Sequence, residues 1–314
     1  MIKFRIMEKT ISSQLKEILH NAGWSHDQLA RQLNMPVRTL VRWLNNQSAP
    51  RRNNSEAITA LYQEIAGRTE VDSIFLADTE KEALSKHITV KELIANKELL
   101  DKVTLYLTYH TNTIEGSTMT IADVKEVLTD DNKVLANKTA REQIEARNHR
   151  AALYYLLDEL NAQGKNFKWT ESLMLNTHLR LMNTLISNAG MYRNHAVRIV
   201  GSYSPLANYM RVPEKTKELF EAVNKQTENL IMRLAWTHAT FEQIHPFSDG
   251  NGRIGRLIMF IQALQSEAMP PLIIKERKYA YYKYLEIANL QGKYDLLRLF
   301  IAESIIFTYN LISK

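Results

Sequence analysis

The sequence predicts an all-α fold that carries one small β-hairpin. Glycine and proline, the residues that most often interrupt helices, number only 10 and 7 in a chain of 314 residues. Apolar residues recur at the three- and four-residue spacing of amphipathic helices along almost the whole chain. β-prone residues gather at 196–200 and 209–212, on either side of a loop rich in Gly, Ser, Pro and Asn. One hairpin cannot build a core sheet, so we expect it to be a surface feature.

The composition is that of a soluble globular protein, with 45% hydrophobic and 24% charged residues. The length favours two domains. The chain has no cysteine, which excludes disulfides and thiolate metal sites. It has no run of about 18 apolar residues and no signal-peptide pattern at its N-terminus, so we expect a cytoplasmic protein without a membrane span.

Positive charge is concentrated near the N-terminus. Residues 1–60 hold nine lysines and arginines against four acidic residues, so five of the six net positive charges lie there. This asymmetry indicates an anionic partner for the N-terminal part of the chain.

The first helices form a pattern of their own. We expect helices at 11–19, 26–33, 38–44 and 55–65, with a short turn at 34–37. Two short helices joined by such a turn make a helix-turn-helix. Its apolar residues have the spacing of a small core, which leaves the polar face of the third helix outward.

Six outward residues are expected to meet DNA, at base edges or phosphates from the third helix and at the backbone elsewhere. They are Arg31, Arg38, Thr39, Arg42, Arg51 and Arg52. The segment resembles the phage-repressor-type helix-turn-helix family over about residues 11–66, and we expect it to bind DNA. The alternative is a four-helix domain that docks on a protein or packs on the rest of the chain.

From about residue 86 onward one helix follows another. We expect helices near 99–107, from 120 onward, and at 138–162, 170–187, 213–244, 252–267 and 276–312. Thr120 and Asp123 form a capping signal for the second of these. A change in composition at 67–73 indicates a linker before this region.

The segment from His245 to Arg256 reads His-Pro-Phe-Ser-Asp-Gly-Asn-Gly-Arg-Ile-Gly-Arg. One helix ends at His245, Gly250 and Gly252 allow backbone conformations closed to other residues, and the next helix begins at about Gly252. The N–H groups of the loop and of that helix therefore point at a common spot suited to an anion. Arg253 and Arg256, on the first turn, add forked donors that suit phosphate.

Two further side chains of this loop bring chemistry. His245 can remove a proton from an attacking hydroxyl near neutral pH. Asp249 can hold Mg²⁺, which prefers oxygen ligands and bridges phosphates. A base, a metal ligand, an anion cradle and two charge clamps are the parts that nucleotidyl or phosphoryl transfer needs.

The segment resembles the motif of the Fic family, His-Pro-Phe-x-Asp/Glu-Gly-Asn-Gly-Arg-x-x-Arg, at every specified position. The resemblance extends over about residues 90–312 and includes Gly190-Met-Tyr-Arg193, which is similar to the family's lead-in to its target-docking flap. The domain limits that we predict are 1–68 for the helix-turn-helix domain, 69–90 for a helical linker, and 91–314 for a helical Fic domain with an inhibitory helix at about 99–116.

The resemblance implies transfer of AMP from ATP to a Ser, Thr or Tyr hydroxyl of a protein target. His245 would take the proton of that hydroxyl, and Asp249 would hold Mg²⁺ between the phosphates. The residues that would line and clamp the phosphates are Gly250, Asn251, Gly252, Arg253 and Arg256. The predicted hairpin would pair with an extended segment of the target through Val197, Ile199, Gly201 and Val212. Tyr282 and Asn289 would lie near the adenosine.

Thr111-Asn-Thr-Ile-Glu115-Gly116 resembles the Fic inhibitory motif, Ser/Thr-x-x-x-Glu-Gly/Asn, in the class with an N-terminal inhibitory helix. The resemblance implies that Glu115 pairs with Arg256 and leaves ATP only an unproductive pose. Members of this class often form homodimers, and the same is implied here. The resemblance leaves open whether the chain also removes AMP.

Two other functions stay open. The motif handles the phosphates and not the base, so the transferred group can also be UMP, phosphate or phosphocholine. The chain can also be a transcription regulator whose Fic domain senses nucleotide and rarely turns over. The intact His245 and Asp249 argue against the second, because a sensor needs no base.

Overall fold

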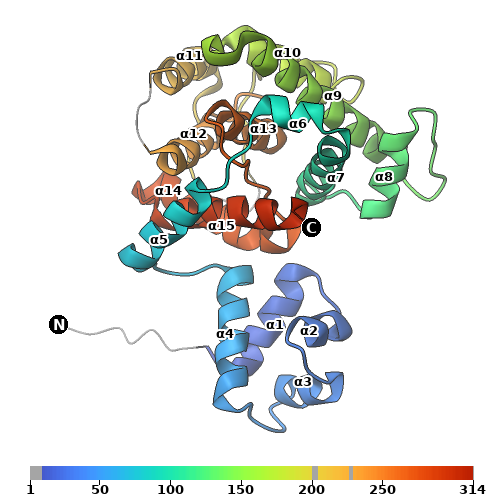
Figure 1. The fold of residues 1–314 in the computed structure, drawn as a ribbon, viewed down its shortest axis with the longest axis vertical. Coiled ribbons are helices and arrows are strands. Elements are labelled where there is room, and N and C mark those ends of the chain that lie inside the picture. Colours follow the sequence, from blue (N-terminus) through green and yellow to red (C-terminus); the bar gives the residue numbers. More distant parts are fainter. Residues whose placement is uncertain (1–8, 200–203, 226–228, 314) are drawn as a thin grey trace. The chain divides into compact units, whose positions relative to one another are not determined.

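The computed structural model describes residues 9–199, 204–225 and 229–313. Regular structure in these ranges is helical throughout, apart from one isolated β-bridge between His87 and Ala268 (Figure 1). The predicted all-α class is therefore confirmed. None of the described helices is both long and apolar enough to cross a membrane.

The chain divides into two compact units. The first is Met1–Glu70 together with Lys275–Tyr284, and the second is Val71–Ile274 together with Leu285–Lys314. Residues 275–284 thus belong to the first unit, although they lie far in sequence from its other residues. The domain limits drawn from the sequence stay a prediction.

The first unit is built from short helices. They are α1 (Ile11–Ala22), α2 (His26–Gln32), α3 (Val37–Leu44) and α4 (Arg52–Ala66), with the 3₁₀ helix η3 (Lys275–Arg277) and the beginning of α14 (Lys278–Gln291). The side chain of Ser25 caps α2 in a capping box with Gln28. Asn34, in a left-handed conformation, lies in the turn between α2 and α3.

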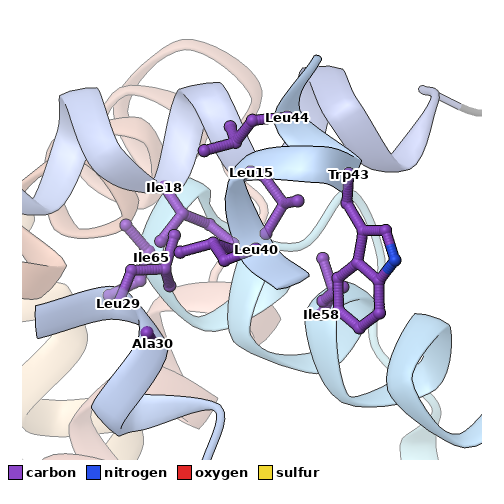
Figure 2. Close-up of a cluster of buried hydrophobic side chains, with 9 residues drawn as sticks. All are labelled: Leu15, Ile18, Leu29, Ala30, Leu40, Trp43, Leu44, Ile58 and Ile65. Atoms are coloured by element: carbon purple, nitrogen blue, oxygen red, sulfur yellow. The ribbon is translucent and has the colours of Figure 1, made fainter. Parts of the chain in front are cut away.

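The four N-terminal helices close over one apolar cluster, shown in Figure 2. Its members come from α1, α2, α3 and α4 and are Leu15, Ile18, Leu29, Ala30, Leu40, Trp43, Leu44, Ile58 and Ile65. Trp43 lies in this core, which excludes it as an outward contact. Burying these side chains is what orients the polar faces of α2 and α3 toward solvent.

The second unit contains the remaining elements (Figure 1). They are α5 (Ser73–Leu84), α6 (Val90–Ala95), α7 (Lys97–Ile114), α8 (Ile121–Thr129), α9 (Ala140–Gln163), η1 (Gly164–Asn166), α10 (Glu171–Leu181), η2 (Tyr209–Arg211), α11 (Val212–Val223), α12 (Leu230–Ile244), α13 (Asn251–Gln265), the end of α14, and α15 (Asp295–Ile312). The sequence signal at Thr120 and Asp123 forms a capping box at the start of α8, as predicted.

Helices α12 and α13 form the centre of the second unit. Nearly every residue of α13 is buried, which is the pattern of a helix enclosed on all sides. Helix α12 packs on α11, α13 and α15, while α13 also contacts α7 and α9. The loop between α12 and α13 therefore lies where α7 and α9 can place side chains against it.

The predicted β-hairpin is not present in the described residues. The strand predicted for its second half, 209–212, is wrong. Tyr209–Arg211 forms η2, and Val212 is the buried first residue of α11. Asn208 caps η2 by accepting a hydrogen bond from the N–H of Met210, and Pro213 occupies the first turn of α11, where its fixed φ suits a helix. These local signals outweigh the β preference of the run. Residues 196–199 have no regular structure, and Gly201 lies outside the described residues.

Truncation of the first-unit core should be costly. Leu40 is fully buried, so Leu40→Ala is expected to lower the free energy of unfolding by about 2–5 kcal/mol, from lost burial and the cavity left behind. Urea titration followed by circular dichroism measures this. Gln32→Ala, on the exposed end of α2, is the control and should change the free energy by less than about 0.5 kcal/mol. Equal stability of the two variants would contradict the packing described here.

Candidate active site

The loop from α12 to α13 begins and ends with left-handed backbone. His245 has φ 50° and ψ 62° and closes α12, and Gly250 has φ 84° and precedes α13. A Cβ on Gly250 would lie 2.9 Å from the sulfur of Met182, so this position has no room for a side chain. The chain thus reverses within a few residues, and the N-terminus of α13 opens directly onto the loop.

Asn251 fixes the shape of the loop. Its side-chain oxygen accepts from the N–H of Phe247 at 2.8 Å, and its side-chain nitrogen donates to the carbonyl of Phe247 at 2.8 Å. Phe247 is fully buried and stacks on His178, with ring centroids 3.6 Å apart. The Asn251 amide therefore braces the loop in this structure, whereas the family resemblance implied that it lines the phosphates.

His178, on α10, contacts the loop and was missed by sequence reasoning. Its Nδ1 accepts from the N–H of Gly190 at 2.9 Å, so Nε2 carries the proton and donates to the carbonyl of Asp249 at 3.0 Å. Burial lowers the pKa of His178 to about 4, which keeps the ring neutral and this tautomer in place.

Arg256, at the first turns of α13, is held by α7. Its Nε donates to Thr111 Oγ1 at 2.6 Å, and its Nη2 donates to Glu115 Oε1 at 2.5 Å. The guanidinium is 3% exposed. A Cβ on Gly252 would lie 2.5 Å from Glu115 Oε1, so only glycine at this position leaves space for the glutamate. The structure thus brings together Glu115 and Arg256, the pair that the sequence predicted.

Glu142 on α9 anchors the segment that follows Glu115. Its carboxylate accepts from the backbone N–H of Thr118 at 2.6 Å and from that of Thr139 at 3.1 Å. Burial raises the pKa of this carboxyl, but the hydrogen bonds outweigh it and lower the pKa to about 2. The end of α7 is therefore tied to the start of α9 by a permanently charged carboxylate.

Arg253 is the more deeply buried clamp, at 2% exposure. Its Nη1 lies 3.5 Å from Glu145 of α9, and its Nη2 donates to Asp249 at 3.3 Å. Its Nε and Nη1 make no hydrogen bond within the described part of the chain. Burying such donors is costly unless a ligand completes them, and phosphate oxygens have the matching geometry.

His245 presents one nitrogen to the loop. Its Nδ1 lies 3.3 Å from the carbonyl of Glu242, an acceptor, so Nδ1 carries the proton and Nε2 has the lone pair. Burial lowers the pKa of His245 to about 4, with Arg193 adding to this, while the Glu242 carbonyl, Glu115 and Asp249 oppose it. The imidazole is therefore neutral at pH 7 and can accept a proton.

Comparison with known proteins identifies this architecture. Residues 168–263 match the Fic/DOC family. The segment that holds the loop is thus similar to the Fic/DOC family. It is 29% identical over 189 residues to the protein adenylyltransferase fic-1 of Caenorhabditis elegans, covering 58% of this chain and 36% of that protein. It is 32% identical over 190 residues to the protein adenylyltransferase Fic of Nematostella vectensis, covering 58% and 42%. The chain thus spans less than half the length of these curated relatives.

Solved structures agree on the fold. A structure of a segment of Fic-1 from Caenorhabditis elegans superposes with a TM-score of 0.64 at 20% identity, covering 96% of this chain and 97% of that one. A Fic-domain-containing signaling protein from Bacteroides thetaiotaomicron gives 0.63 at 22% identity, covering 76% and 96%. The helical arrangement around the loop is therefore that of Fic domains.

The loop offers a magnesium ion one carboxylate, that of Asp249. The Asp249 side chain is 43% exposed, with Oδ2 3.1 Å from Arg141 and Oδ1 accepting from Gly250 and Arg253. In the described residues no group of three or more acidic or histidine side chains converges on one point. One carboxylate completed by phosphate oxygens and water is how Mg²⁺ is commonly held in nucleotide sites, so the donor set fits a nucleotide-bound ion.

No hydrogen bond to the loop is described for the remaining residues predicted at this site. Val197 and Ile199 are half-buried in irregular chain, and Val212 is buried in α11. Asn289 is half-buried on α14, and no hydrogen bond to the loop is described for it. Tyr282 is exposed and belongs to the first unit. The predicted DNA contacts are also in the first unit: Arg31, Arg38, Arg42, Arg51 and Arg52 are exposed, and Thr39 is half-buried.

The protonation state of His245 can be measured directly. Burial should keep its imidazole neutral down to about pH 5, so its Cε1–H resonance should stay unchanged between pH 8 and pH 5.5, on the neutral side of the lowered pKa. The resonance is assigned by its absence from the spectrum of His245→Asn. A midpoint at the ordinary histidine value of about 6.5 would contradict the described burial.

Proposed function

We propose that this chain is a protein adenylyltransferase that moves AMP from ATP to a hydroxyl side chain of a protein. The observation that carries the proposal is the meeting of a neutral histidine with two buried arginines around one helix N-terminus. The names of the curated relatives, which are protein adenylyltransferases, support it. A group other than AMP stays the alternative, because no described contact selects the base.

The reaction follows from the orientation of His245. The acceptor hydroxyl donates its proton to Nε2, and its oxygen attacks the α-phosphorus of ATP. The bond from the α-phosphorus to the bridging oxygen breaks, and pyrophosphate leaves. The carbonyl of Glu242 keeps Nδ1 protonated throughout, so the imidazolium that forms is hydrogen-bonded at that nitrogen.

The phosphates are held by the start of α13. Arg253 and Arg256 stabilise the negative charge that builds up on the β- and γ-phosphates. Their burial holds both guanidinium groups in position before the reaction. Gly252 lies in the first turn of α13, where backbone N–H groups favour an anion, whereas the N–H of Gly250 donates to Asp249 Oδ1 at 2.6 Å. Asp249 would hold Mg²⁺, which supplies further positive charge to the phosphates when bound.

Glu115 inhibits this reaction. Its carboxylate occupies the guanidinium of Arg256 that the γ-phosphate needs, and Thr111 holds the Nε of the same guanidinium. A hydrogen bond between charged groups contributes about 1.5–3 kcal/mol, and the 34% exposure of Glu115 places this one toward the lower end. The proposed acceptor is a hydroxyl on a protein segment that docks near Val197 and Ile199. Homodimer formation and a cytoplasmic location stay predictions from the sequence.

Removal of the glutamate should release the enzyme. Glu115→Gly frees Arg256 for phosphate, so the initial rate of AMP incorporation into protein should rise about tenfold or more, as expected for about 1.4 kcal/mol. The measurement is incorporation of α-labelled ATP into lysate proteins and into the chain itself. Adding His245→Ala to Glu115→Gly is the matched control and should abolish transfer while ATP binding stays. An unchanged rate in Glu115→Gly would refute the inhibitory role.

We also propose that the first unit binds DNA. Arg38 and Arg42 lie exposed on α3, and Arg31 lies exposed on α2, while the apolar faces of both helices are used in the core. A short helix that presents arginines beside a second helix has the form of a major-groove reader. The excess of positive charge in residues 1–60 supports the same partner.

Loss of the two α3 arginines should weaken this binding. Arg38→Ala combined with Arg42→Ala is expected to lower duplex DNA affinity and to reduce the slope of log affinity against log salt by about one for each phosphate that is no longer neutralised. Fluorescence anisotropy with a labelled duplex over a salt series measures both quantities. Arg211→Ala, an exposed arginine of the second unit, is the control. Binding that is unchanged by the double substitution, or absent from the unaltered chain at about 50 mM salt, would count against the proposal.

A further inference from the structure

Arg193 is a buried cation without a carboxylate partner in any described contact. It is 3% exposed, and its guanidinium donates only to backbone carbonyls. Nε donates to His245 at 2.7 Å, Nη1 to His195 at 2.9 Å, and Nη2 to Ala207 at 2.5 Å and Ile244 at 3.4 Å. Burying a cation in this way is costly unless the carbonyls are fixed, so their arrangement and the guanidinium depend on each other.

Two of these carbonyls, those of Ile244 and His245, belong to the end of α12, where the last carbonyls have no helical partner. The carbonyl of Gln243 accepts from the N–H of Ala207 at 3.1 Å, and those of Ile244 and His245 accept from the Arg193 side chain. The carbonyl of Pro246 accepts from the Arg193 N–H at 2.9 Å. Two residues outside the helix, Arg193 and Ala207, thus donate hydrogen bonds to the four consecutive carbonyls from Gln243 to Pro246. The negative end of the helix dipole lies there, which favours a cation.

His245 needs such support because of its backbone. A residue other than glycine in the left-handed region carries a strain of about 1–2 kcal/mol, and it stays there only when its surroundings impose that conformation. The bonds from Arg193 to the carbonyls on both sides of this peptide, Ile244 and His245, supply that constraint. They therefore determine where the imidazole of His245 lies relative to the loop.

We propose that Arg193 is a positioning residue for His245 that also ties the base to the segment where the target docks. The inference rests on the proposed transfer reaction, and it extends it. The same guanidinium bonds His195 and Ala207, which lie on either side of the predicted docking residues Val197 and Ile199. A displacement of His195 or Ala207 would therefore move the Arg193 guanidinium and, through it, the backbone of His245.

The charge of Arg193 has a separate effect that can be measured. Its field lowers the pKa of His245, alongside burial, while the Glu242 carbonyl, Glu115 of α7 and Asp249 raise it. The Glu242 carboxyl lies 3.8 Å from Nδ1, and burial raises its own pKa to about 7, so it is only partly ionised at neutral pH. Geometry and charge can therefore be removed one at a time: lysine keeps the charge without the forked hydrogen bonds, and methionine removes both.

The test uses the full chain with Glu115→Gly as background. Arg193→Lys should lower kcat for AMP transfer by about 10–100-fold, the usual result of misplacing a base, while the dissociation constant for ATP changes less than about twofold. Arg193→Met should lower kcat similarly and raise the His245 pKa, measured from its imidazole resonance, whereas Arg193→Lys should leave that pKa in place. Arg211→Lys and Arg211→Met, at an exposed arginine of η2 paired with Glu214, are the matched controls.

Each outcome decides the proposal. Unchanged kcat in both Arg193 variants would overturn it. Loss of ATP binding together with transfer would also overturn it, because Arg193 would then hold the whole loop and not the base. The resonance measurement needs no turnover, so a failure of the adenylyltransferase proposal itself would appear separately, as absent AMP transfer in Glu115→Gly with the pKa difference between the variants still present.

Discussion

The candidate active site depends on the burial of two guanidinium groups, Arg253 and Arg256, at the start of α13. A buried cation must find partners, and α7 and α9 supply them. Helix α7 supplies Thr111 and Glu115, and α9 supplies Glu145. These contacts hold both guanidinium groups in place: Arg256 is bonded to the Glu115 carboxylate, whereas Nε and Nη1 of Arg253 make no hydrogen bond in the described part of the chain.

Burial, with a smaller contribution from the arginine charges, keeps two neighbouring histidines neutral. His149 on α9 and His238 on α12 are fully buried, and burial with the nearby arginines lowers the pKa of each to about 3. His149 accepts or donates one hydrogen bond with Thr108 at 2.9 Å. Neutral rings pack beside the guanidinium groups without repulsion, which leaves the positive charge at the phosphate loop to Arg253 and Arg256.

Much of this site could be predicted from the sequence, because its key residues are consecutive or belong to short motifs. The loop from His245 to Arg256 spans twelve consecutive residues. Glu115 lies in a short motif, and its family resemblance implies the pairing with Arg256. The bracing residues His178 and Glu145 act through contacts far apart in sequence, so no local spacing reveals them, and Arg193 was noted only as part of the segment before the predicted flap. The run at 209–212 was assigned a strand because it is β-prone, but Asn208 and Pro213 on either side favour helical turns.

The central claim is that Glu115 competes with the terminal phosphates for Arg256. Calorimetric affinities for AMP, ADP and ATP, compared between the unaltered chain and Glu115→Gln, test it most directly, because glutamine removes the charge and keeps the size. The account predicts that the substitution tightens ATP binding by about tenfold, corresponding to about 1.4 kcal/mol, and leaves AMP binding unchanged. An equal gain for AMP and ATP, or no gain for ATP, would contradict it.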